Sequence, residues 1–176
     1  MAHDERTRAW AEGFLLLASA EGRPERIADE LFRFADAFER SDELQNALGD
    51  PRVPAARRQQ IVEDLLGGKA HPLTVGMISA AVAAGRARDL PKMASAFGEL
   101  VARGAGRQVA EVRVVTEPSD EQKERLRRAL EQAVGSEVDL RVVVDPSVLG
   151  GVVARIGDTV IDGSLRSRVQ RLRKVG

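Results

Sequence analysis

The run over residues 142–166 constrains the fold more than any other part of the chain. It opens with β-branched apolar residues, and Gly157-Asp158 then separates two short apolar segments. A two-residue Gly-Asp connection suits the primed turns whose twist matches that of paired strands, so the run predicts a β-hairpin. Asp162-Gly163-Ser164 follows, and short oxygen-bearing side chains can accept the free amide hydrogens of a first helical turn. We therefore expect a strand, a hairpin and a helix, in that order.

Upstream of this run, the sequence predicts a strand, a helix and the start of another strand. Alternate residues from Ala110 to Val114 are apolar, which is typical of a half-buried strand. Ser119 follows a proline and stands three residues before Gln122, the spacing of a helix capping box. A two-residue apolar period returns over residues 138–144. The second half is thus predicted to run strand, helix, strand, hairpin, helix.

The first half has helical periodicity throughout. Ile61 and Leu65 are predicted to face inward on the fourth helix, which Gly67-Gly68 ends. Short links between helices imply a compact bundle. The predicted first residues or caps of the second to sixth helices are Pro24, Ser41, Pro54, Pro72 and Asp89.

Gly104-Ala105-Gly106 marks the predicted boundary between the halves, because glycine ends the sixth helix and loosens the connection. We predict an α+β fold. A six-helix bundle occupies residues 1–104, and a smaller mixed α/β domain occupies residues 105–176.

Composition excludes several classes of function. The 176 residues contain no Cys, so there is no disulfide framework and no thiolate chemistry, which fits a reducing compartment. Lys+Arg and Asp+Glu are equal at 27 each, so the chain as a whole has no strong field for nucleic acid or anionic membranes. Asp4, Glu5 and Glu12 argue against a secretory or transit signal. The longest uncharged stretch, over residues 70–85, is shorter than the ~20 apolar residues of a membrane span. We expect a cytoplasmic protein without membrane insertion.

Two apparent nucleotide motifs fail on their spacing. Gly67-Gly68-Lys69-Ala70 looks like a phosphate loop, but Glu63 stands at the place of the first glycine and Ala70 replaces the Ser or Thr. Gly104-Ala105-Gly106 begins like a dinucleotide fingerprint, yet Val109 replaces the third glycine. A helix end and a linker explain these segments, so we expect no nucleotide or other cofactor.

Catalytic and metal-binding patterns are also missing. His3 and His71 are the only histidines, and neither has the neighbours of a triad or a metal site. Asp145, Asp158 and Asp162 each adjoin Pro or Gly at a predicted turn or cap, which is the commoner use of aspartate. We therefore predict no catalytic residue and no metal ligand.

Two helices of the first half carry more apolar residues than one buried stripe holds. Residues 14–18 are all apolar and span more than a full helical turn at about 100° per residue. Residues 72–85 contain no charge. One interpretation buries this fifth helix at the centre of the bundle. Another leaves a groove between the first and fifth helices for an amphipathic helix of a partner, with Met77 as an adaptable contact. Composition alone favours neither.

The run over residues 142–166 resembles the C-terminal signature of the delta subunit of F-type ATP synthases, the bacterial relative of the mitochondrial oligomycin-sensitivity-conferring protein. The chain also has that family's length and its order of a helical half before a mixed half. We interpret Gly150, Gly151 and Gly157 through backbone geometry, and the segment Asp162-Gly163-Ser164 through capping. The motifs that carry the resemblance are Val144-Asp145-Pro146, Leu149-Gly150-Gly151, Arg155-Ile156-Gly157-Asp158 and Val160-Ile161-Asp162-Gly163-Ser164.

The resemblance implies a non-catalytic stator subunit in the peripheral stalk of ATP synthase, on the cytoplasmic face of the bacterial plasma membrane. The helical half would bind the alpha subunit of the catalytic head, and the second half the C-terminal ends of the membrane-anchored b subunits. By the same resemblance, the first and fifth helices receive the N-terminal segment of the alpha subunit. The residues expected to line that groove are Ala11, Phe14, Leu15, Ala18, Leu73, Met77, Ile78 and Ala81.

Two other classes of function remain as alternatives. The predicted last helix carries Arg166, Arg168, Arg171, Arg173 and Lys174 around an apolar stripe, and such cations could make the chain an RNA-associated adaptor. The absence of aromatic residues after Phe97 argues against base stacking, so we expect no nucleic-acid partner. A small enzyme is the third alternative, and it would have to use His71 or the aspartates.

Overall fold

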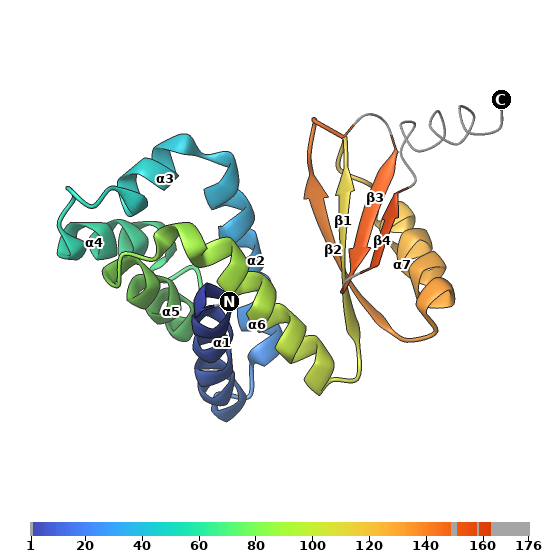
Figure 1. The fold of residues 1–176 in the computed structure, drawn as a ribbon, viewed down its shortest axis with the longest axis horizontal. Helices are drawn as coiled ribbons and strands as arrows, with labels where there is room; N and C mark the ends of the chain where they lie inside the picture. The colour runs from blue at the N-terminus through green and yellow to red at the C-terminus, as the bar shows by residue number, and fades with distance from the viewer. Residues whose placement is uncertain (1, 149–150, 158, 163–176) are drawn as a thin grey trace. The chain divides into compact units, whose positions relative to one another are not determined.

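The structure, a computed structural model, describes residues 2–148, 151–157 and 159–162. The chain divides into two compact units, Met1–Val101 and Ala102–Gly176. Helices make up the first unit, and a sheet with one helix makes up the described part of the second (Figure 1). The predicted α+β fold is confirmed.

The helical unit contains six α-helices and one short 3₁₀ helix among its described residues. The links between them are short, as a compact bundle requires. The elements are α1 (Ala2–Ala20), α2 (Pro24–Arg40), α3 (Asp42–Gly49), α4 (Ala55–Leu66), α5 (Pro72–Ala83), η1 (Ala87–Asp89) and α6 (Leu90–Gly104).

The helices begin where local chemistry predicts. Pro24 and Pro72 occupy the first turns of α2 and α5, where a missing N–H costs nothing. The Ser41 hydroxyl accepts from the Leu44 N–H at 3.1 Å and so caps α3, as predicted. The imidazole Nδ1 of His71 accepts from the Leu73 N–H at 3.2 Å, so this histidine is a helix cap.

The core of the helical unit has α5 at its centre. Met77 and Ile78 of α5 are fully buried together with Ile27 of α2 and Phe97 of α6. The interpretation that buries the fifth helix is therefore correct for its large side chains.

One inward prediction is wrong: Leu65 of α4 is 43% exposed. The buried face of α4 is set by Arg58 and Val62, one turn apart, with Ile61 half-buried beside them. Val62 and Leu66, one helical turn apart, occupy the inward positions near the end of α4, so Leu65 beside them faces solvent.

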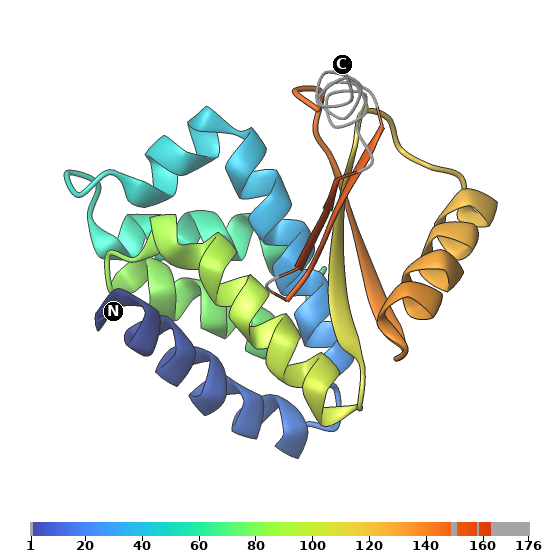
Figure 2. The same ribbon diagram turned by 45° about the vertical axis from the view of Figure 1, so that its right-hand side comes forward.

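The second unit is a four-stranded sheet with one helix on it. The strands are β1 (Gln108–Val114), β2 (Val138–Val144), β3 (Val152–Ile156) and β4 (Thr159–Asp162), in the order β2-β1-β3-β4. β1 pairs parallel to β2, whereas β3 pairs antiparallel to both β1 and β4. α7 (Asp120–Val134) lies on one face of the sheet (Figure 2). Its Leu130 belongs to the same buried apolar cluster as Val112, Val138 and Ala154 of the strands.

Two local predictions for this unit are confirmed. Ser119 accepts from the Gln122 N–H at 3.3 Å while the Gln122 side chain accepts from the Ser119 N–H at 2.8 Å, which is the capping box. Ile156 of β3 pairs with Thr159 of β4, so a two-residue loop joins the hairpin. Gly157 opens that loop with a φ of +55°, which glycine adopts without strain. The predicted last helix, with its five basic residues, lies outside the described residues.

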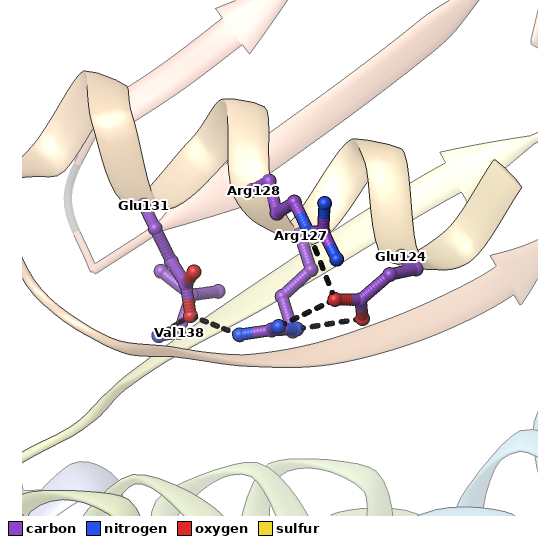
Figure 3. A network of polar contacts seen from close by, with 5 residues as sticks. All are labelled: Glu124, Arg127, Arg128, Glu131 and Val138. Carbon is purple, nitrogen blue, oxygen red and sulfur yellow. Dashed lines mark hydrogen bonds and ion pairs between the residues drawn. The ribbon is translucent and has the colours of Figure 1, made fainter. Parts of the chain in front are cut away.

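A network of ion pairs runs along α7, and one hydrogen bond of this network reaches the edge strand β2 (Figure 3). Arg127 reaches Glu124 at 2.7 Å and pairs with Glu131, and Glu131 also accepts from the Val138 N–H of β2 at 3.2 Å. Hydrogen bonds from Arg127 and then from Arg128 lower the pKa of Glu124 to about 2. The helix is thus held by polar contacts at its rim as well as by the apolar face beneath it.

Candidate protein-interaction surface

α1 exposes large aliphatic side chains that its own unit does not cover. Leu16 is 74% exposed and Leu17 is 51% exposed, whereas Phe14 and Leu15 are half-buried. Four consecutive residues point around most of the helix circumference, so packing α1 against the bundle on one side leaves part of this apolar turn in water. Large exposed aliphatic groups that lie together are typical of protein-interaction sites.

α5 has a different surface. Its large side chains face inward except that of Leu73, which is half-buried, and its exposed positions include Gly76, Ala80 and Ala83, which recur at helical spacing on one side. This arrangement explains how a helix without charge lies in a soluble unit: the residues that reach solvent are small. A helix lined by small residues allows another backbone to approach closely.

α1 and α5 pack against each other in opposite directions. Thr7, near the start of α1, accepts a hydrogen bond from Arg86, just after the end of α5, at 3.3 Å. Arg86 also pairs with Asp89 at 3.1 Å. These contacts fix one end of the α1–α5 pair.

Glu30 of α2 fixes the start of α5. Its carboxylate accepts from the Thr74 hydroxyl at 2.6 Å, from the His71 N–H at 2.8 Å and from Arg26 at 2.8 Å. Burial by itself raises the pKa of Glu30, but the hydrogen bonds from Thr74, His71 and Arg26 outweigh it, and the pKa is lowered. The charged form is therefore the one that the fold stabilises.

An aromatic pair, Trp10 and Phe14, precedes the exposed leucines on α1. The ring centroids of Trp10 and Phe14 are 4.7 Å apart and the rings are tilted by 54°. Both rings are partly buried against the core of the helical unit. The pair thus anchors this part of α1 to the core of the helical unit.

The predicted groove residues fall into two groups. Phe14, Leu15 and Leu73 are half-buried and open to a partner. Contact with a partner stays a prediction for all eight residues, and for the other five it requires the bundle to open. These five residues, each at most 2% exposed, are Ala11, Ala18, Met77, Ile78 and Ala81.

The predicted groove does not include Leu16 and Leu17, although they are the exposed large apolar side chains in the described part of α1. The sequence signal for them was the unbroken apolar run itself. The run indicates that part of its apolar surface stays exposed. Which of its residues are exposed depends on the side of α1 that packs against α2 and α5, and the run does not specify that side.

Hydrogen bonds and backbone geometry account for those residues of the C-terminal signature that the structure describes. Asp145 accepts from the Ser147 hydroxyl at 2.6 Å and the Ser147 N–H at 2.9 Å; these bonds, with Arg113, lower its pKa. Pro146 follows in the same turn, and Gly151 has a φ of +122°. Asp162 is the last residue of β4. Gly150, Gly163 and Ser164 lie outside the described residues.

The described residues contain no cluster of three or more His, Asp or Glu side chains that could hold a metal ion. Over the same residues, no helix combines the length and the apolar character of a membrane span.

Solved structures with a similar fold are chains of ATP synthases. A chain of the Toxoplasma gondii mitochondrial ATP synthase hexamer aligns with a TM-score of 0.62 and 23% identity, covering 96% of this chain and 95% of that one. At that identity the likeness concerns the fold. A chain in the Polytomella F-ATP synthase F1 head and rotor aligns with a TM-score of 0.50 and 25% identity, covering 54% of this chain and 84% of that one.

Sequence comparison identifies closer relatives in actinobacteria. A protein of Nocardia farcinica called ATP synthase subunit delta is 39% identical over 166 residues, which are 93% of this chain and 60% of the relative. Proteins of the same name from Frankia alni and Acidothermus cellulolyticus are 37% and 38% identical. The chain spans about 60% of the length of these relatives. The family described as ATP synthase delta (OSCP) subunit matches residues 7–175, and the chain belongs to this family.

Proposed function

We propose that this chain is a non-catalytic connector in the peripheral stalk of a bacterial F-type ATP synthase, on the cytoplasmic face of the plasma membrane. The helical unit binds the N-terminal segment of the alpha subunit of the catalytic head. The second unit binds the C-terminal ends of the membrane-anchored b subunits. Family membership and the ATP synthase neighbours support this role. The RNA-adaptor alternative has no support from the relatives.

The observation that carries the proposal is the exposed apolar turn of α1. Leu16 and Leu17 are more than half exposed, and Phe14 and Leu15 flank them half-buried. Burying such side chains gives about 25 cal/mol per Å² of apolar surface removed from water. An amphipathic helix of the alpha subunit that covers this turn, with α5 beside it, would bury the surface that the bundle leaves open.

The connector has to resist torque, because the rotor would otherwise turn the head with it. Its two contacts act in series, so the complex is only as strong as the weaker one. A desolvated apolar contact suits this task better than exposed ion pairs, whose median contribution is about 0–1 kcal/mol.

Calorimetry with the N-terminal peptide of the cognate alpha subunit tests the α1 contact. We expect the unchanged chain to bind the peptide, and Leu16→Asp and Leu17→Asp to raise the Kd by about tenfold or more, because a carboxylate then faces an apolar contact. Both positions are exposed, so the variants should keep their helical circular dichroism.

Leu65→Asp is the matched control. It replaces another exposed leucine of the same unit, on α4 and away from α1, and should bind the peptide as the unchanged chain does. Absence of peptide binding, or equal weakening by all three substitutions, would show that α1 is not the docking surface.

A further inference from the structure

A second apolar groove lies on the helical unit, with a volume of about 380 Å³. α2 forms one wall, and the end of α4 with the loop that follows forms the other. The groove lining includes no residue of α1 or α5. It is therefore separate from the surface proposed to bind the alpha subunit. Its apolar lining consists of Phe34, Ala37, Leu44, Leu65, Leu66 and Ala70.

The groove has a buried floor and one open apolar side chain. Phe34 is 7% exposed, and Leu44 and Leu66 are half-buried, but Leu65 is 43% exposed. A large aliphatic group that stands open beside an apolar hollow is poised to pack against a side chain that enters it.

The single carboxylate of the groove, that of Glu30, already accepts three hydrogen bonds within the fold. Three donors, from Thr74, His71 and Arg26, occupy its oxygens, and its side chain is only 10% exposed. Glu30 therefore holds the fold together and offers little attraction to a basic ligand.

The two cations of the groove are available. Arg33 donates to the Asp29 carbonyl oxygen at 3.3 Å, and Lys69 donates to the Leu65 carbonyl oxygen at 3.1 Å. Both are exposed, and neither is in an ion pair within the part of the chain that the structure describes. The groove thus combines an apolar floor with two cations that form no ion pair among the described residues, and its one carboxylate already accepts hydrogen bonds within the fold.

From this charge pattern we propose that the groove binds an acidic amphipathic helix of a partner protein. The α2 residues of the lining extend from Glu30 to Ala37, which is about 10 Å of helix at 1.5 Å per residue. A helix of two turns fits that length, with one or two large apolar side chains in the hollow and carboxylates beside Arg33 and Lys69. The inference does not depend on the proposed alpha-subunit contact.

A pair of designed peptides tests the inference on the full chain. Both are fluorescent, helix-forming 14-residue peptides (about four turns) with leucine on one face; the remaining positions carry glutamate in one and lysine in the other. In anisotropy titrations we expect saturable binding of the acidic peptide and at least about tenfold weaker binding of the basic one.

Variants locate the site. Leu65→Asp, and separately the double change Arg33→Glu with Lys69→Glu, should weaken binding of the acidic peptide by about tenfold, while Leu16→Asp should leave it unchanged. Failure of the acidic peptide to saturate, equal affinity for both peptides, or insensitivity to Leu65→Asp would each overturn the inference.

Two further measurements distinguish other occupants. Sedimentation of the chain alone would reveal a dimer that Leu65→Asp disrupts, and flotation with anionic phosphatidylserine vesicles would reveal lipid binding that the Arg33 and Lys69 changes abolish. Either result would assign the groove to a second copy or to a membrane surface and so contradict the inference.

Discussion

At the scale of single residues, Glu30 shows how one carboxylate positions the start of a buried helix, α5. It receives a hydroxyl, a backbone N–H and a guanidinium, and two of these donors belong to the start of α5. Stability contributed by a carboxylate with a lowered pKa is fully present above its ordinary pKa and is lost as the pH falls through the lowered value. The helical unit should therefore lose this contribution only in acid.

Thr74→Val tests this role. Thr74 is fully buried, and valine keeps its shape but removes the hydroxyl that donates to Glu30. We expect the free energy of unfolding to fall by about 1–3 kcal/mol at neutral pH, because a buried charge loses a donor. Urea unfolding measures this free energy. The difference in free energy between the variant and the unchanged chain should shrink at acid pH, once Glu30 is protonated. Thr116→Val, at an exposed position, should change nothing; a Thr74→Val effect that is the same in acid would contradict the role given to Glu30.

At the scale of elements, α7 depends on its first turn and on its contact with β2. The capping box at Ser119 satisfies two amide hydrogens at the start of the helix, and Glu131 joins the helix to the Val138 N–H. The first set of hydrogen bonds thus fixes where the helix begins, and the second ties its last turn to β2.

Ser119→Ala should destabilise the second unit by about 1 kcal/mol, since the Gln122 N–H loses its acceptor. Amide hydrogen exchange followed by NMR should show faster exchange in the first turn of α7. Ser95→Ala makes the same substitution at an exposed position inside α6 and serves as the control. Unchanged exchange at Gln122 would mean that the capping box contributes nothing.

The start of α7 and the hairpin could be predicted because the chemistry that sets them is local: Ser119 meets Gln122, and Gly157 supplies a turn. The inward face of a helix is decided by distant neighbours. Leu65 was assigned to the interior although Val62 takes that place, and the large residues of α5 turn inward while its small ones reach solvent. Sequence alone predicted an apolar surplus on α1 without identifying Leu16 and Leu17.

At the scale of the whole molecule, each unit has its own apolar core. Ile27, Met77 and Phe97 belong to one cluster, and Val112 and Leu130 to another. Units with separate cores can fold independently. This supports the proposal that residues 1–104 and 105–176 are two domains.

Expression of residues 1–104 alone tests the division. We expect the fragment to keep the helical circular dichroism of its unit and to unfold cooperatively, because all of its core residues are included. The fragment of residues 105–176 is examined in parallel. An unfolded 1–104 fragment would show that the helical unit needs the rest of the chain.

The aromatic pair of α1 gives the chain an intrinsic optical reporter. Trp10 is the only tryptophan, and the chain has no tyrosine. The Trp10 ring packs against that of Phe14, which belongs to the same apolar run as the exposed leucines. Indole emission responds to the polarity around it, so a helix that settles on this turn would alter the colour or intensity of the light emitted. Occupancy of the surface could then be followed in real time without attaching a dye.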